Sequence, residues 1–123
     1  TDAFLNVLQY PYPLSTITVE SGILALQKVN LMDNATKIIK IERQRIIETL
    51  QKFDTFEVFD SKANFVLFDA HSSYKRVYSA LAEQGISIRK LGKIGNHEGC
   101  LRVTIGTKEM NSKFLLAIRD LLQ

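Results

Sequence analysis

The sequence predicts an α+β domain in which helices pack on one face of a small mixed or antiparallel sheet. Apolar residues recur at helical spacing up to about residue 53. From Phe56 onward, short runs rich in aromatic and β-branched residues alternate with further helical segments. The 123 residues are 46% hydrophobic and 24% charged, which suits one modest core. We therefore expect a single α+β domain over residues 1–123.

The first half of the chain predicts two helices. After a proline-containing break, Ser15 or Thr16 can cap a helix that ends near Val29. Asp33 or Asn34 can cap the next and longest helix. The apolar positions expected to face the core are Val19, Ile23 and Leu26 in the first helix and Ala35, Ile39, Ile46, Leu50 and Phe53 in the second. The charged positions expected on a solvated face of the second helix are Lys37, Lys40, Glu42, Arg43, Arg45 and Glu48.

The second half predicts four strands and two helices. The strands are expected at 56–59, 63–69, 86–89 and 100–106. Gly85 ends a helix that begins near Ser72, and Thr107 caps a last helix. The buried face of that last helix is expected to contain Met110, Phe114, Ala117, Ile118 and Leu121.

The connections between these elements predict the sheet. The second and third strands flank a helix, so this crossover should leave them parallel or nearly adjacent in one sheet. The glycine-rich segment 90–99 is expected to be a flexible loop, across which the third and fourth strands pair antiparallel.

The run GCLRVTIGT, residues 99–107, contains an arginine in the middle of a predicted strand. Alternation places Leu101 and Val103 toward the core and Arg102 on the other face. Arg89 ends the neighbouring strand, so the two guanidinium groups could converge on one anion if the strand register allows it. The planar fork of arginine suits carboxylate or phosphate. The alternative is that each arginine pairs with a nearby acid or faces solvent.

The remaining reactive residue types form no complete site. His71 and His97 lie in predicted loops far apart in the sequence, and with Cys100 as the one cysteine they make no recognisable metal site. The spacing of the loop glycines fits neither a P-loop nor a dinucleotide fingerprint. We therefore expect no catalytic residue, no cofactor-binding residue and no metal site in this chain.

Composition also narrows the classes of partner. The net charge of +3 comes from interspersed charges, so RNA binding rests on mild basicity alone, whereas a small anionic ligand is compatible. No apolar run approaches the ~18 residues of a membrane span. A single cysteine favours a reducing, cytoplasmic compartment. The chain opens on residues typical of a helix end rather than on methionine, so we expect a piece of a longer protein.

Several short motifs, in this order, resemble the C-terminal part of histidinol-phosphate aminotransferases. They are PYPLST, ER in a long helix, DSKANFVLF, GISIR and GCLRVTIGT, and they span roughly Tyr10 to Leu122. Members of this family are fold-type I enzymes that depend on pyridoxal 5'-phosphate. The resemblance implies that the chain is the small domain, with residues 1–14 a remnant of the inter-domain connection.

The resemblance also implies an activity and a site. Family members transfer an amino group between L-histidinol phosphate and 2-oxoglutarate in histidine biosynthesis. Arg102 matches the arginine that holds the acidic group of the substrate, and Arg89 matches a second arginine near its phosphate. Asn64 matches a position near the domain junction, which we do not assign as a ligand.

The Schiff-base lysine and the other cofactor residues of the family belong to the large domain. The chain alone is therefore expected to bind no pyridoxal phosphate and to be inactive. The full-length enzyme is expected to be a homodimer. If the large domain is missing, the segment 3–10 and the proline-containing segment should expose apolar surface and favour self-association.

Two other interpretations stay open from the sequence. The parent enzyme could be an aminotransferase for an aromatic or aliphatic amino acid, in which case Arg102 would bind a carboxylate and Arg89 would contribute little. The chain could also be a stand-alone regulatory module that binds a small anion.

Overall fold

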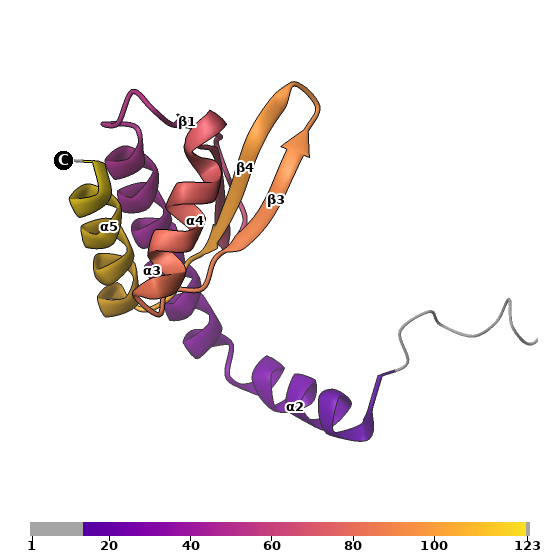
Figure 1. Ribbon diagram of the computed structural model, residues 1–123. Coiled ribbons are helices and arrows are strands. Elements are labelled where there is room, and N and C mark those ends of the chain that lie inside the picture. Colours follow the sequence, from indigo (N-terminus) through magenta and orange to yellow (C-terminus); the bar gives the residue numbers. More distant parts are fainter. Residues whose placement is uncertain (1–13, 123) are drawn as a thin grey trace, which may run out of the picture. The chain divides into compact units, whose positions relative to one another are not determined.

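The computed structural model describes residues 14–122, which divide into a compact unit up to Ala35 and a second from Thr36 onward. The first unit contains α2 (Thr16–Gln27) and the start of α3 (Val29–Leu50). The second contains the rest of α3 and an α+β arrangement, as Figure 1 shows. None of the helices among the described residues is long and apolar enough to cross a membrane.

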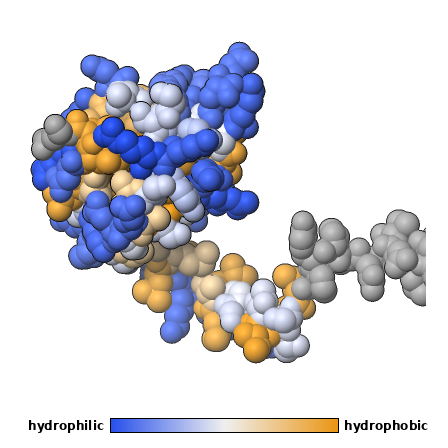
Figure 2. Space-filling view, in the orientation of Figure 1, coloured by the Kyte–Doolittle hydropathy of each residue, from blue (hydrophilic) through white to orange (hydrophobic). Residues whose placement is uncertain are grey.

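The helix α2 begins as the sequence predicts but buries none of its residues. Ser15 caps it, because its hydroxyl oxygen accepts a hydrogen bond from the Thr18 backbone N–H at 3.2 Å. The expected inner face is exposed, with Ile23 at 46% and Leu26 at 70%. Figure 2 shows apolar side chains at the surface of this unit. Helical periodicity identifies an apolar face, but a second element has to cover that face before it is buried.

The helix α3 begins earlier than predicted. It starts at Val29, so Asp33 and Asn34 lie inside it and do not cap it. Only Lys28 separates α2 from α3, and no proline or glycine delays the return to helical geometry. Ile46 and Leu50 of α3 are buried as predicted. Ile39 and Phe53 pack against that core in part, whereas Ala35 is exposed.

Four strands form one sheet in the order β1-β2-β4-β3. They are β1 (Glu57–Val58), β2 (Phe65–Asp69), β3 (Arg89–Ile94) and β4 (His97–Thr104). All neighbouring strand pairs among the described residues are antiparallel. The sequence predicted a mixed or an antiparallel sheet, and the structure has the antiparallel one. Since β2 and β3 both run antiparallel to β4, they are parallel to each other with one strand between them, as the predicted crossover requires.

The crossover between β2 and β3 consists of a short 3₁₀ turn, η1 (His71–Ser73), and α4 (Tyr74–Glu83). Gly85 follows at a φ of +71°, which confirms it as the residue that ends the helix. The last helix, α5 (Lys108–Leu122), completes the layer of helices that Figure 1 shows beside the sheet.

The third strand and its following loop differ from the prediction. The structure has β3 at Arg89–Ile94 and not at 86–89, so most of the predicted flexible loop is a β-hairpin. Gly92 and Gly95 have φ values of +72° and +58°, and they accommodate an irregular register and the turn. Most side chains of this hairpin are exposed, so the sequence lacks the apolar alternation that identifies a strand.

The core lies between the sheet and the helices. The alternation predicted for β4 is confirmed, because Leu101, Val103 and Ile105 are buried. Residues from the helices complete this core, namely Ile46, Leu50, Val77, Leu81, Phe114, Ala117 and Ile118. Thr107 caps α5 as predicted, since its side-chain oxygen accepts from the Met110 N–H at 3.3 Å. Met110 itself is 64% exposed, contrary to the prediction, and lies over Gly106.

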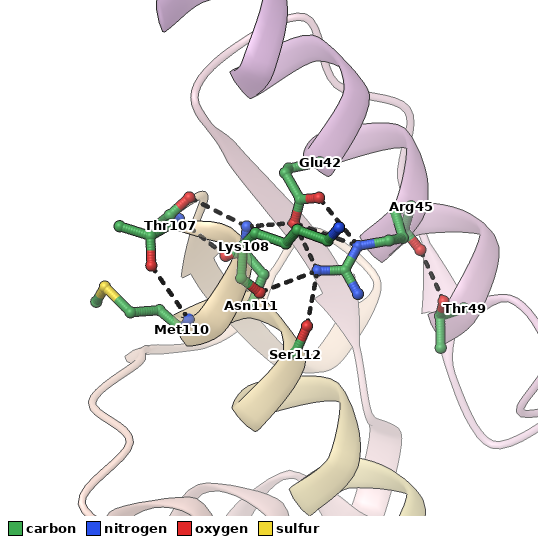
Figure 3. A network of polar contacts seen from close by, with 9 residues as sticks. Glu42, Arg45, Thr49, Thr107, Lys108, Met110, Asn111 and Ser112 are labelled. Atoms are coloured by element: carbon green, nitrogen blue, oxygen red, sulfur yellow. Dashed lines mark hydrogen bonds and ion pairs between the residues drawn. The ribbon is translucent and has the colours of Figure 1, made fainter.

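A buried polar network fixes α5 and the turn after β4 to α3 (Figure 3). Glu42, predicted on a solvated face, is only 5% exposed. Its carboxylate accepts hydrogen bonds from Arg45 and, at 2.8 Å, from the Asn111 side-chain amide. Asn111 also accepts from the Gly106 N–H at 2.9 Å and donates to the Gly106 carbonyl at 3.1 Å. Helical periodicity missed this contact because the partner of Glu42 lies 69 positions away.

We expect Glu42→Gln to destabilise the fold at neutral pH and much less in acid. The hydrogen bond from Arg45 lowers the pKa of Glu42 below its ordinary 4.5, although burial opposes the shift. A depressed folded-state pKa means that the carboxylate stabilises the fold above pH 4.5, and that this contribution is lost as the pH falls through the folded-state pKa. Urea unfolding at pH 7 should show a loss of about 1–3 kcal/mol.

The same measurement in steps down to acid should show wild type and Glu42→Gln converging in stability. Glu48→Gln removes an exposed carboxylate of the same helix and is the matched control. A stability difference between wild type and Glu42→Gln that stays constant across the pH range would contradict this role of the ionised carboxylate.

Candidate anion-binding site

Arg102 lies near the middle of β4, the inner strand that pairs with both β2 and β3. Its side chain is partly buried, and the guanidinium carbon lies 5.0 Å from the centroid of the Phe65 ring on β2. This cation–π contact holds the guanidinium over the sheet face opposite the core. The Nε atom of Arg102 is buried and has no hydrogen-bond partner among the described residues. The side chain thus keeps unused hydrogen-bonding capacity at a supported position.

Arg89 is the first residue of β3 and is the register partner of Arg102. Directly opposed residues of an antiparallel pair project from the same face, with their Cβ atoms about 4.5–5.5 Å apart. The register therefore allows the two guanidinium groups to converge on one anion, which the sequence alone left open. Arg89 is exposed, whereas Arg102 is partly buried. Two like charges directly opposite each other destabilise a sheet unless a counter-charge lies between them.

No counter-charge of that kind is present in the part of the chain that the structure describes. The ion pairs there involve Arg45, His71, Lys93, His97 and Arg119, and none reaches Arg89 or Arg102. A bound carboxylate or phosphate would neutralise the opposed charges and could accept paired hydrogen bonds from an arginine fork. This pair of arginines is therefore a candidate site for an anion.

The surroundings of Arg102 keep its backbone in place. On one side, β2 pairs with it through Leu67, and at the end of β4 the Ile105 N–H donates to the Asn64 carbonyl at 2.9 Å. The turn beyond is held by the network of Glu42 and Asn111. Asn64, whose side chain is exposed, thus contributes a backbone acceptor that extends the β2–β4 pairing.

Phe65 is the residue of this site that the sequence analysis did not identify. The signal for it was present, since alternation along 65–69 places Phe65 and Leu67 on the same face. Which residue of β4 lies beside them depends on the register, which pairs Phe65 with Thr104 and Leu67 with Arg102. Local periodicity does not specify that register.

The chain is similar to histidinol-phosphate aminotransferases along nearly its whole length. It is 36% identical over 111 residues to the histidinol-phosphate aminotransferase of Vesicomyosocius okutanii. The matched region is 90% of this chain and 31% of that protein. The histidinol-phosphate aminotransferase structure from Clostridium acetobutylicum matches with a TM-score of 0.79 at 30% identity, over 97% of this chain and 36% of that one. No family model matches the chain.

A second solved structure has the same architecture and a different name. A decarboxylase from Sulfurospirillum multivorans matches with a TM-score of 0.76 at 29% identity, over 99% of this chain and 36% of that one. In each comparison the chain spans only about a third of the relative's length.

Proposed function

Because this chain belongs to the histidinol-phosphate aminotransferase family, we propose that it is the small domain of such an enzyme and that Arg102 and Arg89 hold the acidic groups of the substrates. The observation that carries the proposal is the pairing of Arg89 with Arg102 on one sheet face, without a counter-charge among residues 14–122. The exposed apolar side chains of α2 are consistent with a surface that a larger domain covers.

The proposed reaction moves an amino group between L-histidinol phosphate and 2-oxoglutarate. The donor carries a phosphate and the acceptor carries carboxylates, so the site has to accept both kinds of anion in turn. The planar fork of arginine meets either anion with two parallel hydrogen bonds. Arg102, supported by Phe65, takes the acidic group in both half-reactions, and the exposed Arg89 reaches toward the phosphate.

The described residues fit the substrate anion but do not fit covalent attachment of pyridoxal phosphate. All ten lysines of the chain are exposed, and a lysine that anchors this cofactor needs a buried site where its pKa is lowered. When bound to the complete enzyme, the cofactor would supply the electron sink of the transamination. We propose that the residues holding it belong to a large domain, that the full-length enzyme is a cytoplasmic homodimer, and that this chain alone does not transaminate.

The test is a comparison of amino donors with the full-length enzyme. With 2-oxoglutarate as acceptor, L-histidinol phosphate should have a kcat/KM higher than that of L-histidinol by on the order of a hundredfold or more. L-Histidinol is the matched control because it lacks only the phosphate. A kcat/KM for phenylalanine or leucine that equals that of L-histidinol phosphate would instead identify an amino-acid aminotransferase. Absence of transamination with every donor would overturn both assignments.

A further inference from the structure

A second polar cluster, separate from the two arginines, lies where β1, β2 and the start of β4 meet. The His97 Nδ1 atom lies 3.3 Å from a Glu57 carboxylate oxygen and 3.4 Å from Asp69 Oδ2. The His71 Nδ1 atom lies 3.3 Å from the same Asp69 oxygen. Glu57, Asp69 and His97 each offer one ligand atom, and these atoms all lie within 4.8 Å of one another.

Asp69 is the unusual member of this cluster because its carboxylate is almost completely buried, at 1% exposure. Its Oδ1 atom accepts hydrogen bonds from the backbone N–H groups of His71 at 2.7 Å and Gly99 at 3.0 Å. Its Oδ2 atom is buried and has no hydrogen-bond partner in the described part of the chain. The contacts with the two imidazoles therefore lack hydrogen-bond geometry. A buried carboxylate oxygen without a partner is costly, so a cation is expected beside it.

We propose that Glu57, Asp69 and His97 bind one divalent transition-metal ion of the zinc class. In a tetrahedral zinc site, metal–ligand bonds of about 2.0–2.2 Å place neighbouring ligand atoms about 3.3–3.6 Å apart. The two separations from His97 Nδ1, 3.3 Å and 3.4 Å, agree with this spacing. An imidazole with two carboxylates suits zinc better than magnesium or calcium, which prefer oxygen ligands alone. The fourth position is open to water.

The backbone around the cluster holds these ligands in place. His71 has a φ of +49°, an uncommon conformation for a residue with a side chain, which brings its ring beside Asp69. A Cβ atom at Gly99 would lie 2.2 Å from the His71 carbonyl oxygen, so only glycine permits this close approach. The Phe59 ring meets the His97 imidazole edge-to-face, with centroids 4.8 Å apart, and thereby restrains its orientation. Restraint of this kind around the ligands is typical of metal sites.

From the sequence alone, His71 and His97 were expected in separate loops, with no metal site. In the structure His97 begins β4 and His71 lies in η1, and both reach the same carboxylate. The ligands come from positions 57, 69 and 97, so no short spacing motif marks them in the sequence. The pairing of β1 and β2 makes Glu57 the register partner of Asp69 and so brings the two carboxylates together.

The test is zinc titration of the metal-free 123-residue chain, prepared without a histidine tag and followed by calorimetry. We expect one Zn²⁺ per chain. His97→Gln and Glu57→Gln should each weaken binding by about tenfold or more. Glu98→Gln is the matched control, because it removes an exposed carboxylate beside His97 that pairs instead with Lys93 at 2.7 Å. Its affinity for zinc should stay close to that of wild type.

Two further readouts do not depend on the stoichiometry. Zinc at about a hundred times its Kd should raise the Tm of wild type by on the order of 10 °C, with little change in His97→Gln. Cobalt should show the intense visible absorption of four-coordinate Co²⁺ in wild type and Glu98→Gln, but not in His97→Gln or Glu57→Gln. Circular dichroism checks that each variant is folded. A wild-type chain that binds no zinc, or zinc affinities that are equal in wild type and both variants, would overturn the proposal.

Discussion

Arg102→Ala in the full-length enzyme should lower kcat/KM for both L-histidinol phosphate and 2-oxoglutarate. In the site we propose, the variant would remove a bidentate charged contact worth on the order of 2–4 kcal/mol, which corresponds to roughly 30- to 1000-fold in rate. Both half-reactions should suffer because, in that proposal, each substrate presents an acidic group to the same guanidinium. Steady-state kinetics with each substrate varied in turn measures the effect.

The comparison variants separate charge from geometry. Arg102→Lys keeps the charge but loses the planar fork, so most of the loss should remain. Arg89→Ala should affect the phosphate-bearing donor more than 2-oxoglutarate. Arg119→Ala, at an exposed position on α5, is the control and should leave kcat/KM unchanged. Unchanged kinetics for both substrates in Arg102→Ala would remove the assignment of Arg102 as an anion ligand.

Gly99→Ala should be among the most destabilising single substitutions in this chain. The added methyl carbon would lie 2.2 Å from the His71 carbonyl oxygen and 2.8 Å from the His71 backbone nitrogen. Both atoms belong to the backbone, so relief requires η1 to move away from β4. That movement would also break the hydrogen bond from the Gly99 N–H to the buried Asp69. We expect a loss of about 3 kcal/mol and a Tm lower by roughly 10–20 °C.

The control for this substitution is Gly22→Ala. Gly22 lies within α2 with no atom near the position of its missing Cβ, and alanine favours helix more than glycine does. This variant should therefore be neutral or slightly stabilising in the same thermal unfolding experiment. A Tm for Gly99→Ala within about 2 °C of wild type would show that η1 yields easily and would contradict the close packing described above.

Much of the fold follows from local patterns. The change from helical to strand periodicity near Phe56 predicted the α+β class. Alternation in 101–105 predicted which side of β4 is buried, and therefore that Arg102 lies on the other side. Thr107, and Ser15 as one of two candidates with Thr16, were predicted as caps because capping depends on atoms three residues away. Each of these predictions rests on contacts that are close in the sequence.

The sequence by itself thus determined the class of fold, the buried face of β4 and the presence of arginines on two neighbouring strands. Only the tertiary structure decided that Arg89 and Arg102 are register partners, that Glu42 is buried against Asn111, and that His97 meets Glu57 and Asp69. The physical reason is common to all three. Register and long-range polar contacts depend on how whole elements pack, and a side chain has no local periodicity that reveals a partner tens of residues away.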